Sequence, residues 1–129
     1  MMNDDYLGLD VGMVRTGIAR ASAVAKLAEP LTIVPTNDLV GELMRLSKDK
    51  VLKGLIVGLP RSLDGNETAQ TKWVREWADE ASKEIKVPFY FQDEALTTKE
   101  AERKAPNNLH SDALAAAIIL QDYLDGQKD

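Results

Sequence analysis

The chain has no cysteine among its 129 residues, which excludes disulfide bonds, zinc–thiolate sites and cysteine nucleophiles. It also has no apolar run that approaches the roughly 18 residues needed to span a membrane. Asp4 and Asp5 stand where a secretory signal would have a basic region and then an apolar core. We therefore expect a soluble, cytoplasmic protein with no membrane partner.

Positive charge is also scarce. The chain carries 16 Lys and Arg against 21 Asp and Glu, so its formal net charge is −5. A chain of this kind lacks the general basic footprint of a non-specific DNA-binding protein. Local basic patches remain compatible with nucleic-acid binding, and a cluster of catalytic carboxylates would itself add negative charge. The charge balance mildly disfavours the binding of nucleic acid but does not exclude it.

Length and composition fit one folded unit. With 129 residues, 44% of them hydrophobic and 29% charged, the chain resembles ordinary soluble globular proteins. This length supports one hydrophobic core but not two. We expect residues 1–129 to form a single domain that exists as a monomer or a weak homodimer.

The N-terminal segment predicts a β-hairpin. Two apolar runs, residues 6–10 and 16–21, are separated by a turn that contains glycine. Asp10 ends the first strand, and Gly12 has no Cβ, so a phosphate or a metal-bound oxygen can approach the backbone closely there. A carboxylate beside such a turn suits a divalent metal bound to a phosphorylated substrate. An aspartate is also a common turn residue, so both readings stay open.

The rest of the chain alternates strands and helices. A three-strand meander followed by alternating α and β elements predicts an α/β mixed sheet with helices on both faces. The two later strands should lie parallel to the first, because helices separate them in the sequence. The further expected elements are strands at residues 31–34 (at a sheet edge), 54–58 and 87–91, and helices at residues 37–47, 68–85, 97–103 and 111–124.

The long helix at residues 68–85 contains two tryptophans on one face. Helical periodicity predicts a buried stripe made of Ala69, Trp73, Trp77 and Ala81. The alternative, a stacking platform for nucleic acid, would require Trp73 and Trp77 to be exposed.

Acidic residues stand at three places that the predicted sheet brings together. Asp10 ends the first strand, Asp93 and Glu94 end the last strand, and Asp112 lies in the first turn of the final helix. Ligands of open α/β sheets bind outside the carboxyl ends of the strands. Carboxylates suit Mg²⁺ or Mn²⁺, and two such ions roughly 3.5–4 Å apart support in-line phosphoryl displacement. Alternatively, Asp112 only favours the helix N-terminus, by about 0.3–1 kcal/mol.

Four motifs follow one another along nearly the whole chain. They are residues 8–12 (GLDVG) with Arg15 and residues 17–19; residues 56–60 (IVGLP) with residues 64–65; residues 93–94 (DE) with residues 96–98 and 100–102; and residues 111–112 (SD) with residues 115–116 and 119–124. Together they resemble the YqgF family of Holliday-junction-resolvase-like proteins and pre-16S rRNA nucleases. The resemblance implies a ribonuclease H-like fold and metal-dependent nuclease chemistry.

The resemblance also ranks the acids. It implies that the catalytic and metal-binding residues are Asp10, Glu94 and Asp112. Strand alternation sends Asp93 and Glu94 to opposite faces, so only one of the two should point inward. The resemblance favours Glu94 and leaves Asp93 as the less certain candidate.

Two features depart from the family pattern. Ala95 stands where the pattern has an arginine, whose guanidinium could clamp a phosphate through two hydrogen bonds. The connection before the last helix, residues 103–111, is short, and its fixed positive charges are Arg103 and Lys104. Both departures weaken the binding of substrate while leaving the expected metal ligands in place.

Several other residues are candidates for contact with substrate. Arg15 in the glycine turn faces either a phosphate or the solvent, and residues 59–66 follow a buried strand whose end lies at the same edge. His110 is either a general acid–base or a surface residue beside a helix start. The expected substrate-binding set comprises Gly12, Arg15, Arg61, Asn66, Thr97 and Thr98.

Three function classes remain. The first is an endonuclease, dependent on Mg²⁺ or Mn²⁺, that acts on structured nucleic acid such as an rRNA precursor or branched DNA. The second is a binding or scaffold protein that kept the fold after losing the motif arginine. The third is a nucleotide-binding protein, because Asp10, Gly12 and Gly17 also resemble the phosphate turn of sugar kinases and actin-like ATPases. That superfamily closes two domains over its nucleotide, and this chain supplies one.

Overall fold

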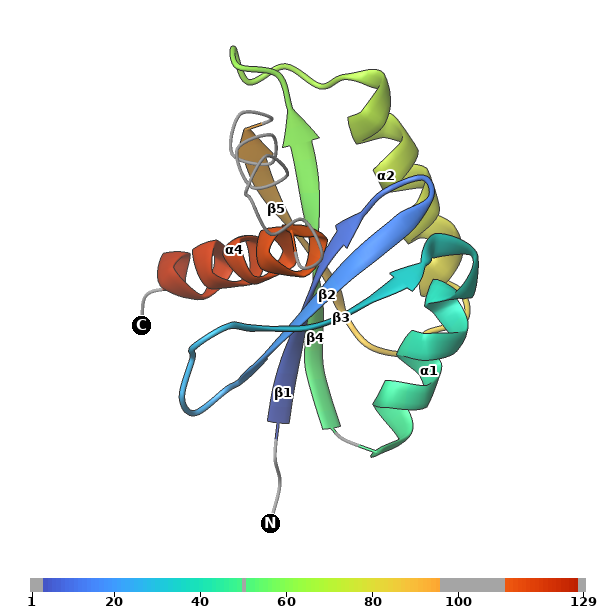
Figure 1. Cartoon of the computed structure of the whole chain (residues 1–129), viewed down its shortest axis with the longest axis vertical. Coiled ribbons are helices and arrows are strands. Elements are labelled where there is room, and N and C mark those ends of the chain that lie inside the picture. Colours follow the sequence, from blue (N-terminus) through green and yellow to red (C-terminus); the bar gives the residue numbers. More distant parts are fainter. Residues whose placement is uncertain (1–3, 50, 96–110, 128–129) are drawn as a thin grey trace.

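The computed structural model describes residues 4–49, 51–95 and 111–127 (Figure 1). Its strands form one sheet in the order β3-β2-β1-β4-β5. None of the helices in these ranges is long and apolar enough to cross a membrane. The elements in chain order are β1 (Asp4–Val11), β2 (Arg15–Ser22), β3 (Glu29–Pro35), a 3-10 turn η1 (Thr36–Asp38), α1 (Leu39–Asp49), β4 (Val51–Arg61), α2 (Ala69–Ser82), β5 (Phe89–Ala95) and α4 (Ser111–Gly126).

The predicted sheet topology is confirmed. β1 and β2 form an antiparallel hairpin in which Asp10 pairs with Gly17, and β3 continues the meander to the edge of the sheet. β4 is parallel to β1, and β5 is parallel to β4. The carboxyl ends of β1, β4 and β5 therefore lie at one edge of the sheet, as expected for the ligand-binding edge of an open α/β sheet.

The two later strands are longer than the apolar runs that predicted them. β4 continues to Arg61 and β5 continues to Ala95, because the backbones of these polar segments still pair with each other, up to the partners Arg61 and Ala95. Asp93 and Glu94 consequently lie within the paired part of β5, near its carboxyl end. Their side-chain directions are therefore fixed by strand pairing.

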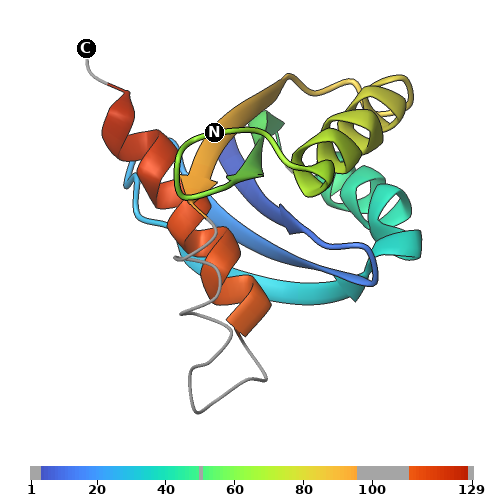
Figure 2. The ribbon, with the colours of Figure 1, turned by 90° about the horizontal axis from the view of Figure 1, so that it is seen from above.

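The expected placement of helices on both faces is confirmed. α1 and α2 cover one face of the sheet and α4 covers the other (Figure 2). The first face buries side chains such as Leu9 and Val57 against Leu43 and Val74. The second buries residues such as Ile56 against Leu120 of α4. The chain thus has one apolar layer on each side of the central strands.

Helix α2 begins where the sequence indicates, but its buried stripe differs from the predicted one. The Thr68 hydroxyl accepts a hydrogen bond from the Thr71 backbone N–H, and the Thr71 hydroxyl accepts one from the Thr68 backbone N–H, which forms a capping box. Of the stripe expected at Ala69, Trp73, Trp77 and Ala81, only Ala81 is fully buried: Ala69 is exposed, and the indoles are partly buried against the core. The buried residues are Thr71, Val74, Ala78 and Ala81. Small side chains fill the narrow line nearest the sheet, and the bulky rings flank it.

Helix α4 lies directly on the sheet because glycines face it. A Cβ at Gly17 would lie 1.9 Å from the backbone oxygen of Asp112, and a Cβ at Gly8 would lie 2.6 Å from the Cβ of Leu120. A Cβ at Gly58 would lie 2.4 Å from the Cδ1 of Ile119. No side chain fits in these places, so glycine permits the close approach. The first turn of α4 is thereby held against β2.

Candidate active site

Asp10 lies on the face of β1 that α4 covers. The side chains of a strand alternate between faces, so Asp10 shares its face with Tyr6 and Gly8. Tyr6 contacts the Tyr123 ring of α4, with centroids 6.1 Å apart, and Gly8 packs under Leu120. Only 1% of the Asp10 surface is exposed. A charged residue is therefore held in the interior at the carboxyl end of a parallel strand.

Asp112 reaches the same place from the far end of the sequence. It lies in the first turn of α4 and is 4% exposed. Its backbone abuts Gly17, which is the direct cross-strand partner of Asp10. The helix N-terminus also favours a negative charge at this position. Gly17 thus adjoins both Asp10 and Asp112, and α4 places Asp112 at the same edge of the sheet as Asp10.

Glu94 occupies the same face on β5. Its cross-strand partner is Pro60, and on its own strand it shares a face with Tyr90, whose ring stacks on Tyr123 of α4 at 5.6 Å. Glu94 is 7% exposed, whereas Asp93 points to the opposite face and is exposed there. Alternation therefore separates the two neighbouring acids, and Glu94 is the one on the α4 side.

The three buried acids share a face and an edge, but they do not form a finished metal site. Their oxygen donors suit Mg²⁺ or Mn²⁺ in kind. β4 stands between β1 and β5, and through its pairings Asp10 is level with Gln92, two residues before Glu94. The backbones of Asp10 and Glu94 are therefore more than two strand spacings, about 9.5 Å, apart. Within residues 4–49, 51–95 and 111–127, no group of three or more Asp, Glu or His residues is arranged to hold a metal ion. That Asp10, Glu94 and Asp112 bind one cation together stays a prediction.

Arg15 is a further component of this edge. At the start of β2, its Nε donates a hydrogen bond to Oδ2 of Asp112, and the two side chains form an ion pair. The hydrogen bond and the negative charge of Asp112 raise the pKa of Arg15 above its usual value. The sequence prediction of a phosphate-facing or solvent-facing Arg15 did not include this contact. Local spacing holds no signal for a pair 97 positions apart.

The glycine turn between β1 and β2 is tied to the chain that follows β3. The backbone N–H of Gly12 donates to the Arg15 carbonyl oxygen at 3.1 Å, which closes the turn. The Thr36 hydroxyl donates to the Gly12 carbonyl at 2.6 Å and lies 2.8 Å from the buried hydroxyl of Thr16. Gly12 is thus placed beside the candidate site with its backbone groups used by the turn. Thr16 and Thr36, which sequence reasoning did not single out, fix this geometry.

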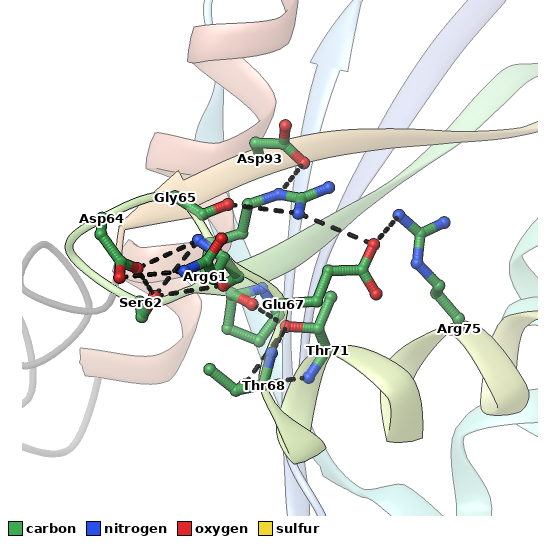
Figure 3. A network of polar contacts seen from close by, with 11 residues as sticks. Arg61, Ser62, Asp64, Gly65, Glu67, Thr68, Thr71, Arg75 and Asp93 are labelled. Atoms are coloured by element: carbon green, nitrogen blue, oxygen red, sulfur yellow. Dashed lines mark hydrogen bonds and ion pairs between the residues drawn. The ribbon is translucent and has the colours of Figure 1, made fainter.

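The candidate substrate residue Arg61 lies in a separate polar network (Figure 3), and hydrogen bonds join Asn66 to the same loop. Arg61 forms ion pairs with Asp93 at 2.9 Å and Glu67 at 3.6 Å, on the face opposite Glu94. Asn66 donates its side-chain amide to Asp64 at 2.9 Å. The structure therefore uses both residues to close the loop after β4 and does not bring them to the three acids.

The loop after β4 contains a tight turn that ends at Gly65. Gly65 has φ +86°, a left-handed conformation that glycine adopts without strain, and its N–H donates to the Ser62 carbonyl at 2.9 Å. Hydrogen bonds from Ser62 and Asn66 lower the pKa of the exposed Asp64. Thr97, Thr98, His110 and the helix expected at residues 97–103 lie outside the described residues.

Comparison with solved structures supports the expected architecture. RuvC of T. thermophilus, solved in complex with a Holliday junction substrate, superposes with a TM-score of 0.56 at 19% sequence identity, and the match covers 93% of each chain. At this identity the likeness concerns the fold alone. It confirms the ribonuclease H-like α/β fold that the family resemblance implied.

Sequence comparison identifies the family. Residues 4–126 match the family model described as "RuvX: Holliday junction resolvase". The chain is 36% identical over 133 residues to the "Putative pre-16S rRNA nuclease" of Roseiflexus sp. (strain RS-1), covering 95% of this chain and 94% of that one. It is 35% identical over 139 residues to the protein of the same name from Chloroflexus aurantiacus, covering 98% and 91%. The resemblance carried by the four motifs is thereby confirmed, and the chain belongs to the RuvX family.

Proposed function

We propose that this chain is a divalent-metal-dependent endonuclease that acts on structured nucleic acid. The observation that carries the proposal is the burial of Asp10, Glu94 and Asp112 on one face of the sheet, at the carboxyl edge of its parallel strands. Burying a carboxylate is costly, and functional sites are where such groups concentrate. The names of the family and of its members supply the substrate class, which is structured RNA or branched DNA.

The roles follow from the placement of the side chains. Asp10, Glu94 and Asp112 would hold Mg²⁺ or Mn²⁺ through their carboxylate oxygens. When bound, such an ion polarises the scissile phosphate and lowers the pKa of the attacking water. The protein fixes Asp10 by sheet pairing and Asp112 by the contact of α4 with Gly17. We further propose that residues 1–129 act as one domain in the cytoplasm, as a monomer or a weak homodimer.

A cleavage assay tests this function. The purified chain is incubated with a labelled four-way DNA junction and, separately, with a structured RNA that carries an unprocessed rRNA end. We expect slow cleavage of at least one substrate with MnCl₂ or MgCl₂ and none in EDTA. Failure to cleave either substrate with either metal would favour the second candidate function, a nucleic-acid-binding scaffold.

Ala95 is the observation that favours the scaffold alternative. It directly follows Glu94 in β5, where the family pattern has an arginine. We expect Ala95→Arg to tighten nucleic-acid binding and to steepen the slope of log affinity against log salt by about 0.9 for one added phosphate contact on duplex DNA. Fluorescence anisotropy at several salt concentrations measures both quantities.

Ala25→Arg is the matched control for this substitution. It adds the same charge at an exposed position after β2, at the opposite end of the sheet from Asp10. We expect it to change the affinity less and to leave the cleavage rate as it is. Equal effects of the two arginines would show that only net charge matters, and that Ala95 is not a lost phosphate contact.

A further inference from the structure

We propose that Arg15 occupies the place of a cation on Asp112, and that its guanidinium has to leave this carboxylate before a metal ion can bind there. The inference rests on the proposed metal site and adds a positioning residue to it. Arg15 would hold the side chain of Asp112 in the metal-free protein and would compete with the metal for the same oxygen.

The first support is the asymmetry of the pair. The Asp112 side chain is 6% exposed, whereas that of Arg15 is 63% exposed. Removing one member of a pair that contains a buried carboxylate is costly, because the buried charge loses the compensation of that partner. The exposed guanidinium loses little hydration in the pair and can return to water at little cost. Arg15 can therefore depart, and Asp112 cannot.

The second support is that backbone anchors hold both ends of the pair. The carbonyl of Arg15 accepts a hydrogen bond from Gly12 at 3.1 Å, and the backbone of Asp112 is pressed against Gly17. Departure of the guanidinium therefore needs only side-chain rotation, with no movement of β2 or α4. Such rotations of exposed side chains are fast.

The third support is the state of the site itself. Among the described residues, no three side chains are arranged to hold a metal ion, although the buried carboxylates of Asp10, Glu94 and Asp112 lie on one face of the sheet and at its carboxyl edge. The oxygen that accepts from Arg15, Oδ2 of Asp112, is one of the two through which this carboxylate can bind a metal ion. A guanidinium and a divalent cation repel each other, so each binds the carboxylate more weakly when the other is present.

Linkage gives the measurable consequence. A ligand that displaces a competing group binds more tightly when that group is removed. Arg15→Gln should therefore lower the melting temperature in EDTA, because Asp112 loses its ion pair with Arg15, and should tighten Mn²⁺ binding. We expect an affinity gain of about two- to fivefold, the change that corresponds to one partly exposed ion pair.

The experiment measures the melting temperature in EDTA and the Mn²⁺ affinity, the latter from the electron paramagnetic resonance signal of free Mn²⁺. Arg20→Gln is the matched control, because Arg20 pairs with the buried Asp5 at 3.2 Å at the opposite end of the sheet. It should lower the melting temperature without changing the Mn²⁺ affinity. Arg15→Lys should restore most of the melting temperature and give an intermediate affinity, because an ammonium holds a carboxylate less specifically.

The outcomes separate this inference from the proposed function. If wild type binds Mn²⁺ and Arg15→Gln binds it equally or more weakly, the competition is refuted and the metal site stands. If neither wild type nor Arg15→Gln binds Mn²⁺ at millimolar concentration, the metal site is refuted and the inference falls with it. In an Asp112→Asn background, Arg15→Gln should leave the Mn²⁺ affinity unchanged, and a gain there would also refute the proposal. Should Arg15→Gln not fold, the comparison of wild type with Arg15→Lys decides.

Discussion

Asp10→Asn is expected to abolish metal-dependent cleavage while the protein stays folded. The amide has the shape of the carboxylate but lacks the charge that would bind the metal, and a metal contributes several kcal/mol to the stabilisation of the transition state. Each 1.36 kcal/mol corresponds to a factor of ten, so we expect the rate to fall by about a thousandfold or more. Single-turnover cleavage in MnCl₂ measures this loss.

The melting temperature of Asp10→Asn should not fall by much, because the substitution removes a charge from a site that is 1% exposed. Asp93→Asn is the matched control, since it makes the same chemical change next to Glu94 but on the opposite face of β5. Its exposed ion pair with Arg61 is worth about 0–1 kcal/mol, so its cleavage rate should remain near that of wild type. Cleavage by Asp10→Asn at the wild-type rate would remove Asp10 from the site.

Gly17→Ala should destabilise the protein and displace Asp112. The added Cβ would lie 1.9 Å from the backbone oxygen of Asp112 and 2.3 Å from its carbonyl carbon. Backbone atoms cannot rotate away, so the first turn of α4 has to move as a unit. Overpacking in a well-packed interior costs about 1–3 kcal/mol, a large part of the roughly 5–15 kcal/mol of a typical domain. Urea unfolding monitored by circular dichroism measures the change.

Gly41→Ala provides the control of opposite sign. Gly41 lies in α1, and a Cβ there would meet no atom within 4 Å. Alanine is favoured over glycine inside a helix by about 0.5–1 kcal/mol, so this variant should be more stable than wild type. If Gly17→Ala were as stable as Gly41→Ala, α4 would not be seated on the sheet as described.

Much of the architecture could be predicted from the sequence because its signals are local. Apolar runs bounded by glycine and proline gave each strand, and the order of strands and helices gave the mixed topology. The carboxyl ends of β4 and β5 are harder to predict from the sequence. Arg61 and Glu94 belong to these strands through backbone pairing, and their polar side chains do not indicate it. The stripe of α2 was misplaced because its hydrophobicity favours Trp73 and Trp77, whereas the space beside the sheet favours Val74 and Ala78.

The candidate site divides along the same line. The placement of Asp10 at a strand end follows from the pattern of apolar residues, and strand alternation alone separates Asp93 from Glu94. The contacts of Arg15 and Arg61 did not follow, because a long charged side chain finds its partner through tertiary geometry. The distances among the three acids depend on the spacing of the strands and on the position at which α4 packs against the sheet. The sequence encodes these two quantities only through packing.

Positions 58 and 119 should vary together among members of the family, whereas position 17 should stay glycine. The atoms that exclude a side chain at Gly58 belong to the end of the Ile119 side chain, so a smaller residue at 119 makes room for alanine at 58. The atoms that exclude one at Gly17 belong to the backbone at Asp112, and they persist whatever residue stands there. A substitution of Gly58 can therefore be compensated by a smaller residue at position 119, whereas a substitution of Gly17 cannot be compensated by any residue at position 112. If positions 58 and 119 covary among relatives while position 17 stays glycine, the sequences of the family reflect how α4 packs on the sheet.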